Sequence, residues 1–220
     1  MDRVLFKNRR DDVAENTDLL QGSVKEFIES VAAKTPTPGG GSVAGVVGAL
    51  GVALSEMALN FTRGKKKFAE HEALYAAVAQ RFAKARTMFA DLMADDMEAF
   101  QLYQSSTRLP DGQEKDQAVQ LATAAAIDVP REMAKLALAA LADMRSLADK
   151  CNPYLVSDLV AGAALASAVV RLCDYNVRMN VPNVADRQAA TEIALASRTD
   201  VARANNTLDE IEKALAPQGG

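Results

Sequence analysis

Two acidic residues stand in stretches whose pattern otherwise calls for apolar side chains. Aromatic residues recur at seven-residue spacing along one predicted helix, at Tyr75, Phe82, Phe89 and Tyr103. Asp96 takes the seam position between the last two. A buried carboxylate is costly, so it must be neutral, ion-paired or facing a wet cavity, and a carboxylate held in this way can move protons as a general acid or base. Asp158 is a second acid in an apolar stretch, and for Asp96 an ion pair with a neighbouring helix is the structural alternative.

A proline-glycine segment leads into a long run of small residues. Pro36 and Pro38 force an extended backbone, and three glycines then free it, so a helix should begin near residue 41 without a side-chain cap. Glycine inside a helix costs about 1 kcal/mol relative to alanine, so this run needs compensation. Close packing of another helix and a ligand held by N–H groups at the helix start both remain open. The candidate binding residues here are Pro38, Gly39, Gly40, Gly41 and Ser42.

Further candidates come from positive charges and side-chain amides. Lys65, Lys66 and Lys67 form a compact basic cluster after the small-residue helix, and Ser157 adjoins Asp158. Asn176 and Asn180 share one helix face at a spacing of four residues. Asp158 and Asn176 lie five turns apart on one helix, about 27 Å, so they cannot touch one small reacting group within one protomer. An elongated ligand, a second subunit or a structural role for one of them would resolve this.

Long helices must position these residues, and the sequence predicts an all-α, up-and-down bundle. Ser23 and Glu26 form a capping-box pattern that begins a short lead-in helix. Four long helices are expected at about 41–62, 68–106, 113–149 and 185–214, the third of them kinked at Pro130. Another helix follows Pro153 and is apolar on nearly every side, so it should lie at the centre of the fold.

Composition narrows the class of protein. The 220 residues suit a single domain over 23–214, with a flexible arm at 1–22 and a frayed tail at 215–220. A net charge of −4 argues against nucleic-acid binding. No secretory signal is evident, and charged residues are expected to interrupt the apolar segments before they could span a membrane. Two cysteines and one histidine favour a cytoplasmic protein without a metal site or disulfide framework.

Several sequence blocks resemble the cyclodeaminase/cyclohydrolase family of folate enzymes. They occur in the family's order at Thr35–Gly45, Asn60–Phe68, Ala94–Phe100, Asp128–Pro130, Ser157–Asp158 and Asn176–Asn180. The resemblance extends over about residues 23 to 210, and the proline-glycine block followed by the lysine block is its most specific part. Asp174 departs from the family pattern, which usually has a small apolar residue there, and the segment around Tyr103 to Arg108 is divergent.

The resemblance implies a homodimer that acts on a tetrahydrofolate derivative and has no permanently bound cofactor. Hydrolysis of the methenyl bridge needs a base for the attacking water and a proton for the departing N5 nitrogen. Asp96 fits the base, and Asp158 is its partner or the acceptor that orients the pterin ring. Lys66 is the candidate proton donor, while Lys65 and Lys67 could hold the glutamate tail.

Three functions follow from this resemblance. We expect a methenyltetrahydrofolate cyclohydrolase, because the cyclodeaminases are often fused to a formiminotransferase domain that this chain lacks. A stand-alone formiminotetrahydrofolate cyclodeaminase, which releases ammonia, is the enzymatic alternative. A helical dimer that binds a folate or pterin without catalysis, with Asp96 locked in a salt bridge, is the third.

Overall fold

The computed structural model describes residues 22–215, and in this part of the chain it contains helices and no strand. This confirms the predicted all-α class. Most of the predicted arm at 1–22 and of the tail at 215–220 lies outside the described residues. The α-helices are α1 (Val24–Ala32), α2 (Gly40–Asn60), α3 (Glu72–Thr107), α4 (Gln113–Leu147), α5 (Val156–Asn180) and α6 (Arg187–Glu212). Short 3-10 turns are η1 (Lys66–His71), η2 (Pro153–Leu155), η3 (Val181–Asn183) and η4 (Lys213–Leu215).

The chain divides into two compact units at Pro36, and α1 belongs to the first. The predicted capping box begins this helix: the Glu26 N–H donates to Ser23 Oγ at 3.2 Å, and the Ser23 N–H donates to Glu26 Oε2 at 2.6 Å. The second unit begins at Thr37 and contains helices α2 to α6. A single domain over 23–214 stays a prediction.

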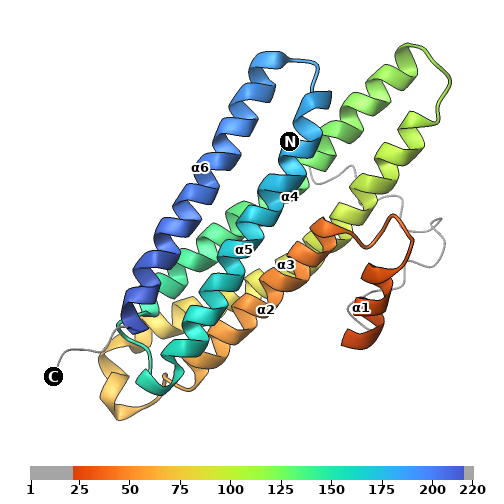
Figure 1. Ribbon diagram of the computed structural model, residues 1–220. Helices are drawn as coiled ribbons and strands as arrows, with labels where there is room; N and C mark the ends of the chain where they lie inside the picture. Colours follow the sequence, from red (N-terminus) through yellow and green to blue (C-terminus); the bar gives the residue numbers. More distant parts are fainter. Residues whose placement is uncertain (1–21, 216–220) are drawn as a thin grey trace. The chain divides into compact units, whose positions relative to one another are not determined.

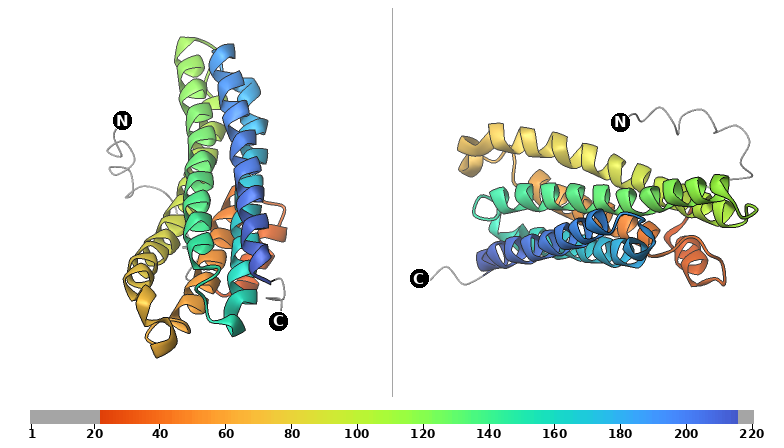
Figure 2. Two further views of the ribbon diagram at one scale, coloured as in Figure 1. Left: turned by 90° about the vertical axis from the view of Figure 1, so that its left-hand side faces the viewer. Right: turned by 90° about the horizontal axis from the view of Figure 1, so that it is seen from above.

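Helices α2 to α6 run alternately up and down in two layers (Figures 1 and 2). One layer holds α2, α5 and α6, with α5 in the middle, and the other holds α3 and α4. Helix α5 contacts α2, α4 and α6, so the apolar helix has the central place that its composition predicts. The termini of these helices form the two ends of the bundle, and the candidate residues divide between those ends.

The seven-residue seam of α3 is the inner face of that helix. Tyr75, Phe82 and Phe89 are fully buried, as are the smaller seam residues between them. Asp96 continues the same face and is only partly buried, so it marks the point where the seam leaves the apolar core. The heptad pattern therefore located this acid correctly on an inward face.

The small residues of α2 allow unusually close helix packing, which is one of the two compensations that the sequence left open. A Cβ on Gly51 would lie 2.9 Å from the Gly162 carbonyl oxygen of α5, and a Cβ on Gly162 would lie 2.6 Å from the Gly51 carbonyl oxygen. The two backbones meet directly, so neither position has room for a side chain. Gly48 likewise accepts the Phe89 ring of α3 against its backbone.

Substituting Gly51→Ala is expected to lower the unfolding free energy by about 1–3 kcal/mol, because a backbone rather than a flexible side chain must move. Urea denaturation followed by circular dichroism measures the change. Gly40→Ala is the matched control, since its Cβ would meet only Asn176 Oδ1, at 3.9 Å. Equal stability of the two variants would show that the α2–α5 contact tolerates a methyl group.

The expectation that charges interrupt every long apolar segment is wrong for α2. Glu56 is the single charged residue among its 21 residues, and by length and composition both α2 and Pro153–Asn183 could cross a membrane. Within the bundle 50% and 44% of these apolar stretches are buried. Core helices of helical bundles share this composition, so length and composition alone give little support for membrane insertion.

Candidate functional site

Asp96 of α3 lies against the first turn of α2. The Ser42 hydroxyl donates to Asp96 Oδ2 at 3.3 Å, and Ser42 itself is completely buried. A Cβ on Gly41 would overlap the carboxyl group of Asp96, so glycine is required for this approach. Helix α2 has Gly39 at its N-cap and no side-chain cap of its own. The carboxylate of α3 therefore occupies the place at which a capping side chain would normally lie.

Two opposing effects set the protonation of Asp96. Burial raises the pKa of this carboxyl above its ordinary value, and the hydrogen bonds from the Ser42 side chain and backbone oppose that rise. The positive end of α2 also favours the charged form. A carboxylate with a raised pKa is a better proton acceptor than an exposed aspartate.

No basic side chain neutralises Asp96 within residues 22–215. The ion pairs of this part of the chain engage other acids, and none has an oxygen of Asp96 within 4.0 Å of a lysine or arginine nitrogen. The structural ion pair considered for Asp96 is thus contradicted by the geometry. The Asp96 carboxylate accepts hydrogen bonds from neutral donors, so its charge is available to a cationic ligand.

The C-terminal part of α5 reaches the same end of the bundle. Asn176 Oδ1 faces Gly40, and no hydrogen bond of the Asn176 side chain is found in the described chain. Cys173, one turn earlier, is 1% exposed; burial and the nearby Asp96 raise the pKa of its thiol to about 12. Cys173 was not among the sequence candidates, although its spacing of three residues from Asn176 places both on one face of the helix.

Asn180 has a structural explanation. Pro130 lies inside α4 without breaking it, and because proline has no N–H, the Ala126 carbonyl loses its helical partner. The Asn180 side-chain amide donates to that carbonyl at 3.5 Å and to the Asn176 carbonyl at 2.9 Å. Both amide hydrogens therefore serve backbone oxygens. The substrate-binding role of Asn180 stays a prediction, with only its side-chain oxygen left for a ligand.

The remaining candidates lie at the opposite end of the bundle. The lysine cluster, Lys65 to Lys67, follows the C-terminus of α2, about 30 Å from Ser42 at 1.5 Å per residue. Asp158 is in the first turn of α5, where it contributes to the raised pKa of the Cys151 thiol, and the adjacent Ser157 is exposed. The structure thus brings Asp96 together with Ser42 and Asn176, and it does not bring Asp158 or Lys66 to them within one chain.

The end of the bundle that holds Lys65, Lys66 and Lys67 carries exposed positive charge. All three lysines are exposed, and none forms an ion pair with an acid of the described chain. Asp158 is half-buried at a helix N-terminus, a position where a carboxylate is stabilised by the helix dipole. It is less deeply placed than its apolar sequence context suggested, because Ser157 and several alanines of α5 face outward.

Asp174, which departs from the family pattern, forms an ion pair and a hydrogen bond with neighbouring side chains. Its carboxylate accepts from Arg178 Nε and from Ser197 Oγ, both at 2.8 Å, and the residue is almost fully buried. The hydrogen bond from Ser197 links α5 to α6, while the ion pair with Arg178 lies within α5. Asp174 is therefore satisfied structurally and gives no reason to place it in the reaction.

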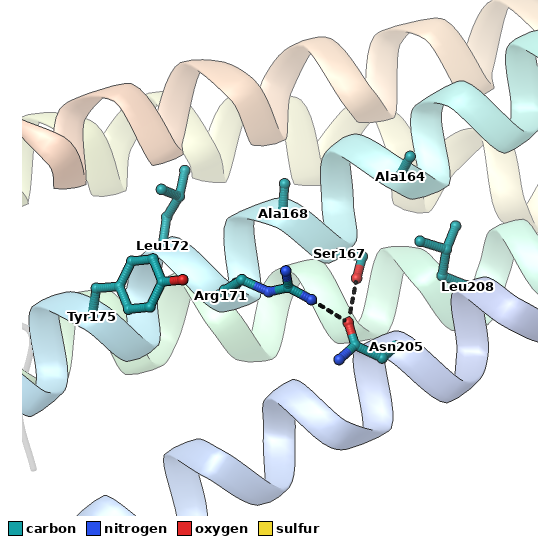
Figure 3. Close-up of a pocket in the computed structure, with 8 residues that line it drawn as sticks. All are labelled: Ala164, Ser167, Ala168, Arg171, Leu172, Tyr175, Asn205 and Leu208. Carbon is teal, nitrogen blue, oxygen red and sulfur yellow. Dashed lines mark hydrogen bonds between the residues drawn. The ribbon is translucent and has the colours of Figure 1, made fainter.

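A separate hollow of about 290 Å³ lies between α5 and α6 (Figure 3). Its polar centre is Asn205 Oδ1, which accepts from Arg171 Nη2 at 3.0 Å and from Ser167 Oγ at 3.4 Å. None of the candidate residues lines it; the lining is Ala164, Ser167, Ala168, Arg171, Leu172, Tyr175, Asn205 and Leu208. The hollow is therefore distinct from the Asp96 site.

Comparison with known proteins decides the family. Residues 23–199 match the family described as Formiminotransferase-cyclodeaminase. The chain belongs to this family. It is 32% identical to the methenyltetrahydrofolate cyclohydrolase of Methylorubrum extorquens over 77% of this chain and 84% of that protein. It is 29% identical to the formimidoyltransferase-cyclodeaminase of Rattus norvegicus over 80% of this chain, which spans about a third (33%) of the rat protein.

A solved structure of the family has the same fold. The formiminotetrahydrofolate cyclodeaminase of Thermotoga maritima superposes with a TM-score of 0.80 at 30% identity, over 90% of this chain and 97% of that one. The resemblance noted in the sequence is therefore confirmed at the level of the formiminotransferase-cyclodeaminase family.

Proposed function

We propose that this protein hydrolyses 5,10-methenyltetrahydrofolate to 10-formyltetrahydrofolate. The single observation that carries the proposal is Asp96: a partly buried carboxylate with a raised pKa, held by neutral donors and without a basic partner in residues 22–215. The methenyl bridge is a delocalised cation, which is the kind of group that such a carboxylate attracts. The similarity to the Methylorubrum extorquens cyclohydrolase, over most of both chains, supports the same reaction.

The proposed reaction uses Asp96 as the general base. It takes a proton from the water that attacks the carbon between N5 and N10, and a neutral tetrahedral adduct forms. The bond from this carbon to N5 then breaks, N5 receives a proton, and the carbon remains on N10 as a formyl group. One proton of the water ends on N5 and the other is released to solvent, which balances the loss of the substrate's positive charge.

We propose that two copies of the chain share each site. Asp96 and Asn176 lie at one end of α2 and the lysine cluster at the other, about 30 Å away. A two-fold axis near the midpoint of α2 would place the partner's α2 antiparallel and bring its lysine end to Asp96. The cation of the substrate would then meet Asp96 while its glutamate carboxylates meet the partner's Lys65 and the partner's Lys67.

The exposed faces of α2 and α5 support this arrangement. Leu50 is the midpoint of α2 and is 57% exposed, and Phe61 just beyond the helix is also 57% exposed. Three alanines of α5, at positions 161, 164 and 168, are exposed at helical spacing, and two of them, Ala164 and Ala168, line the hollow between α5 and α6. Apolar side chains exposed on these two neighbouring helices are suited to contact with a second copy of the chain.

Absorbance of methenyltetrahydrofolate, followed with and without the purified protein, tests the proposed function. We expect consumption well above the spontaneous rate, with 10-formyltetrahydrofolate as the product. Decay at the spontaneous rate, under conditions where the protein is folded by circular dichroism, would contradict the cyclohydrolase proposal.

A cyclodeaminase is the second candidate, because this chain resembles the formiminotetrahydrofolate cyclodeaminase of Thermotoga maritima over 97% of that protein. Elimination of ammonia from 5-formiminotetrahydrofolate proceeds at the same carbon, so Asp96 could serve it as well. Ammonia released from the formimino compound, measured with a coupled glutamate dehydrogenase assay, separates the two. Ammonia release without methenyl hydrolysis would replace the first proposal by the second.

The pH dependence should report the protonation of Asp96. The base must be ionised, so kcat/KM falls as pH drops through its pKa. Because burial raises that pKa above its ordinary value of 3.8, the acid limb of the profile is expected at higher pH than for an exposed aspartate. Initial rates across the acidic range, corrected for the spontaneous reaction, measure this limb; activity that stays constant down to the ordinary aspartate range would contradict the assignment of the base.

A further inference from the structure

We propose that Gly41 and Ser42 are positioning residues for Asp96, and that the first turn of α2 binds this carboxylate of the protein rather than a group of the substrate. The inference rests on the proposed function, in which Asp96 is the base. It replaces one of the two interpretations that the sequence left open for the glycine-rich segment, in which its N–H groups hold a ligand.

The backbone of α2 shows why this turn needs a partner. The first hydrogen bond within the helix runs from the Val43 N–H to the Gly39 carbonyl at 3.0 Å, so the N–H groups before Val43 have no partner inside the helix. Gly39 at the N-cap has no side chain to satisfy them. Asp96 of α3, 54 residues later than Ser42, lies against this turn: its carboxylate accepts the Ser42 hydroxyl, and the Ser42 backbone N–H also helps to lower its pKa.

The small size of Gly41 lets the carboxylate come this close. A Cβ at this position would overlap both carboxyl oxygens and the carbon between them, whereas a Cβ on Gly40 would have ordinary contacts only. Ser42 then fixes one oxygen by its hydroxyl at 3.3 Å. The other oxygen, Oδ1, accepts no side-chain hydrogen bond in the described chain and is available to a water or a cation.

Few titratable groups surround this carboxylate. Helix α2 has none before Glu56, which is paired with Arg86. On α5, Cys173 faces Asp96 and stays a neutral thiol, and Asp174 is paired with Arg178. On α4, Asp128 is paired with Arg131. The neutral donors of α2 are therefore the main groups that hold the charge of Asp96.

Ser42→Ala provides the first test. Removing a hydrogen bond to a charged group is expected to lower kcat about ten- to a hundredfold with KM changed less than about twofold. The Ser42 bonds lower the pKa of Asp96, so the acid limb of the pH profile should move to higher pH. The matched control is Ser55→Ala: Ser55 is equally buried in α2, but its hydroxyl donates to the Gly51 carbonyl at 3.0 Å. This control should keep the wild-type kcat and pH profile.

A measurement without substrate separates this inference from the proposed function. The ¹³C signal of the Asp96 carboxyl, assigned by its absence in Asp96→Asn, is titrated in each variant. Ser42→Ala should raise the pKa of Asp96. Gly41→Ala should shift both its pKa and its chemical shift, while Gly40→Ala leaves the titration as in wild type. These results would support the positioning role even if the protein hydrolysed no folate.

Two outcomes would overturn the inference. A higher KM with unchanged kcat and pH profile in Ser42→Ala would make Ser42 a substrate contact, as the sequence first suggested. An unchanged Asp96 titration in Ser42→Ala would show that the turn does not hold the carboxylate. If Gly41→Ala fails to fold, Ser42→Ala alone decides, because it removes one oxygen atom and adds no bulk.

Discussion

Asp96→Asn is expected to abolish turnover while the protein stays folded. Loss of a general base typically lowers the rate about 10²- to 10⁴-fold, and an amide cannot accept the proton of the attacking water. The amide oxygen can still accept the hydrogen bond from Ser42, so the contact with the first turn of α2 is kept. Single-turnover and steady-state rates with methenyltetrahydrofolate measure the loss.

The stability of the Asp96→Asn variant provides a second, independent test of the role of Asp96. The folded-state pKa of this carboxyl lies above its ordinary value, so its contribution to stability is present at low pH and is lost as pH rises through the folded pKa. At neutral pH the charged form is therefore unfavourable for folding, and the neutral amide removes that cost. Thermal unfolding should show a melting temperature equal to or higher than that of wild type.

Asp91→Asn is the matched control, because Asp91 is an exposed residue of the same helix and undergoes the same chemical change. It should retain wild-type activity and stability. An Asp96→Asn variant with full activity and a lower melting temperature would identify Asp96 as a structural residue and end the catalytic assignment.

Local periodicity explains why the fold and the position of Asp96 could be predicted. The seven-residue seam of α3 and the glycine spacing of α2 are patterns within one helix, and each helix buries the face that its pattern marks. Ser23 and Glu26 similarly carry their capping signal within four residues. These features can be recognised without knowing which other helices pack beside them.

Partners that lie far apart in the sequence could not be predicted in this way. Nothing near Ser42 indicates that an acid 54 residues later fills the helix start, and nothing near Asn180 indicates that Pro130 leaves a carbonyl without a partner. The depth of Asp158 was overestimated for a different reason. Alanines pack equally well facing inward or outward, so an alanine-rich helix does not reveal which of its faces is buried.

The division of the candidate residues between two ends of the bundle has a consequence that mixing experiments can measure. If each site combines Asp96 of one chain with the lysine cluster of the other, Asp96→Asn and the triple variant Lys65→Ala/Lys66→Ala/Lys67→Ala should both be poorly active alone. A mixed dimer would then contain one site with both lesions and one site with none.

Co-expression with two affinity tags and tandem purification isolates that mixed dimer. It should recover about half of the wild-type activity per dimer, because one of its two sites is intact. Sites formed within single chains predict the opposite result, since each site of the mixed dimer would then carry one lesion and remain inactive. A mixed dimer no more active than its parents would refute the shared site, and full activity of the lysine variant alone would remove the cluster from the reaction. The experiment thus uses the 30 Å separation along α2 to determine whether Asp96 and the lysines act on the same substrate molecule.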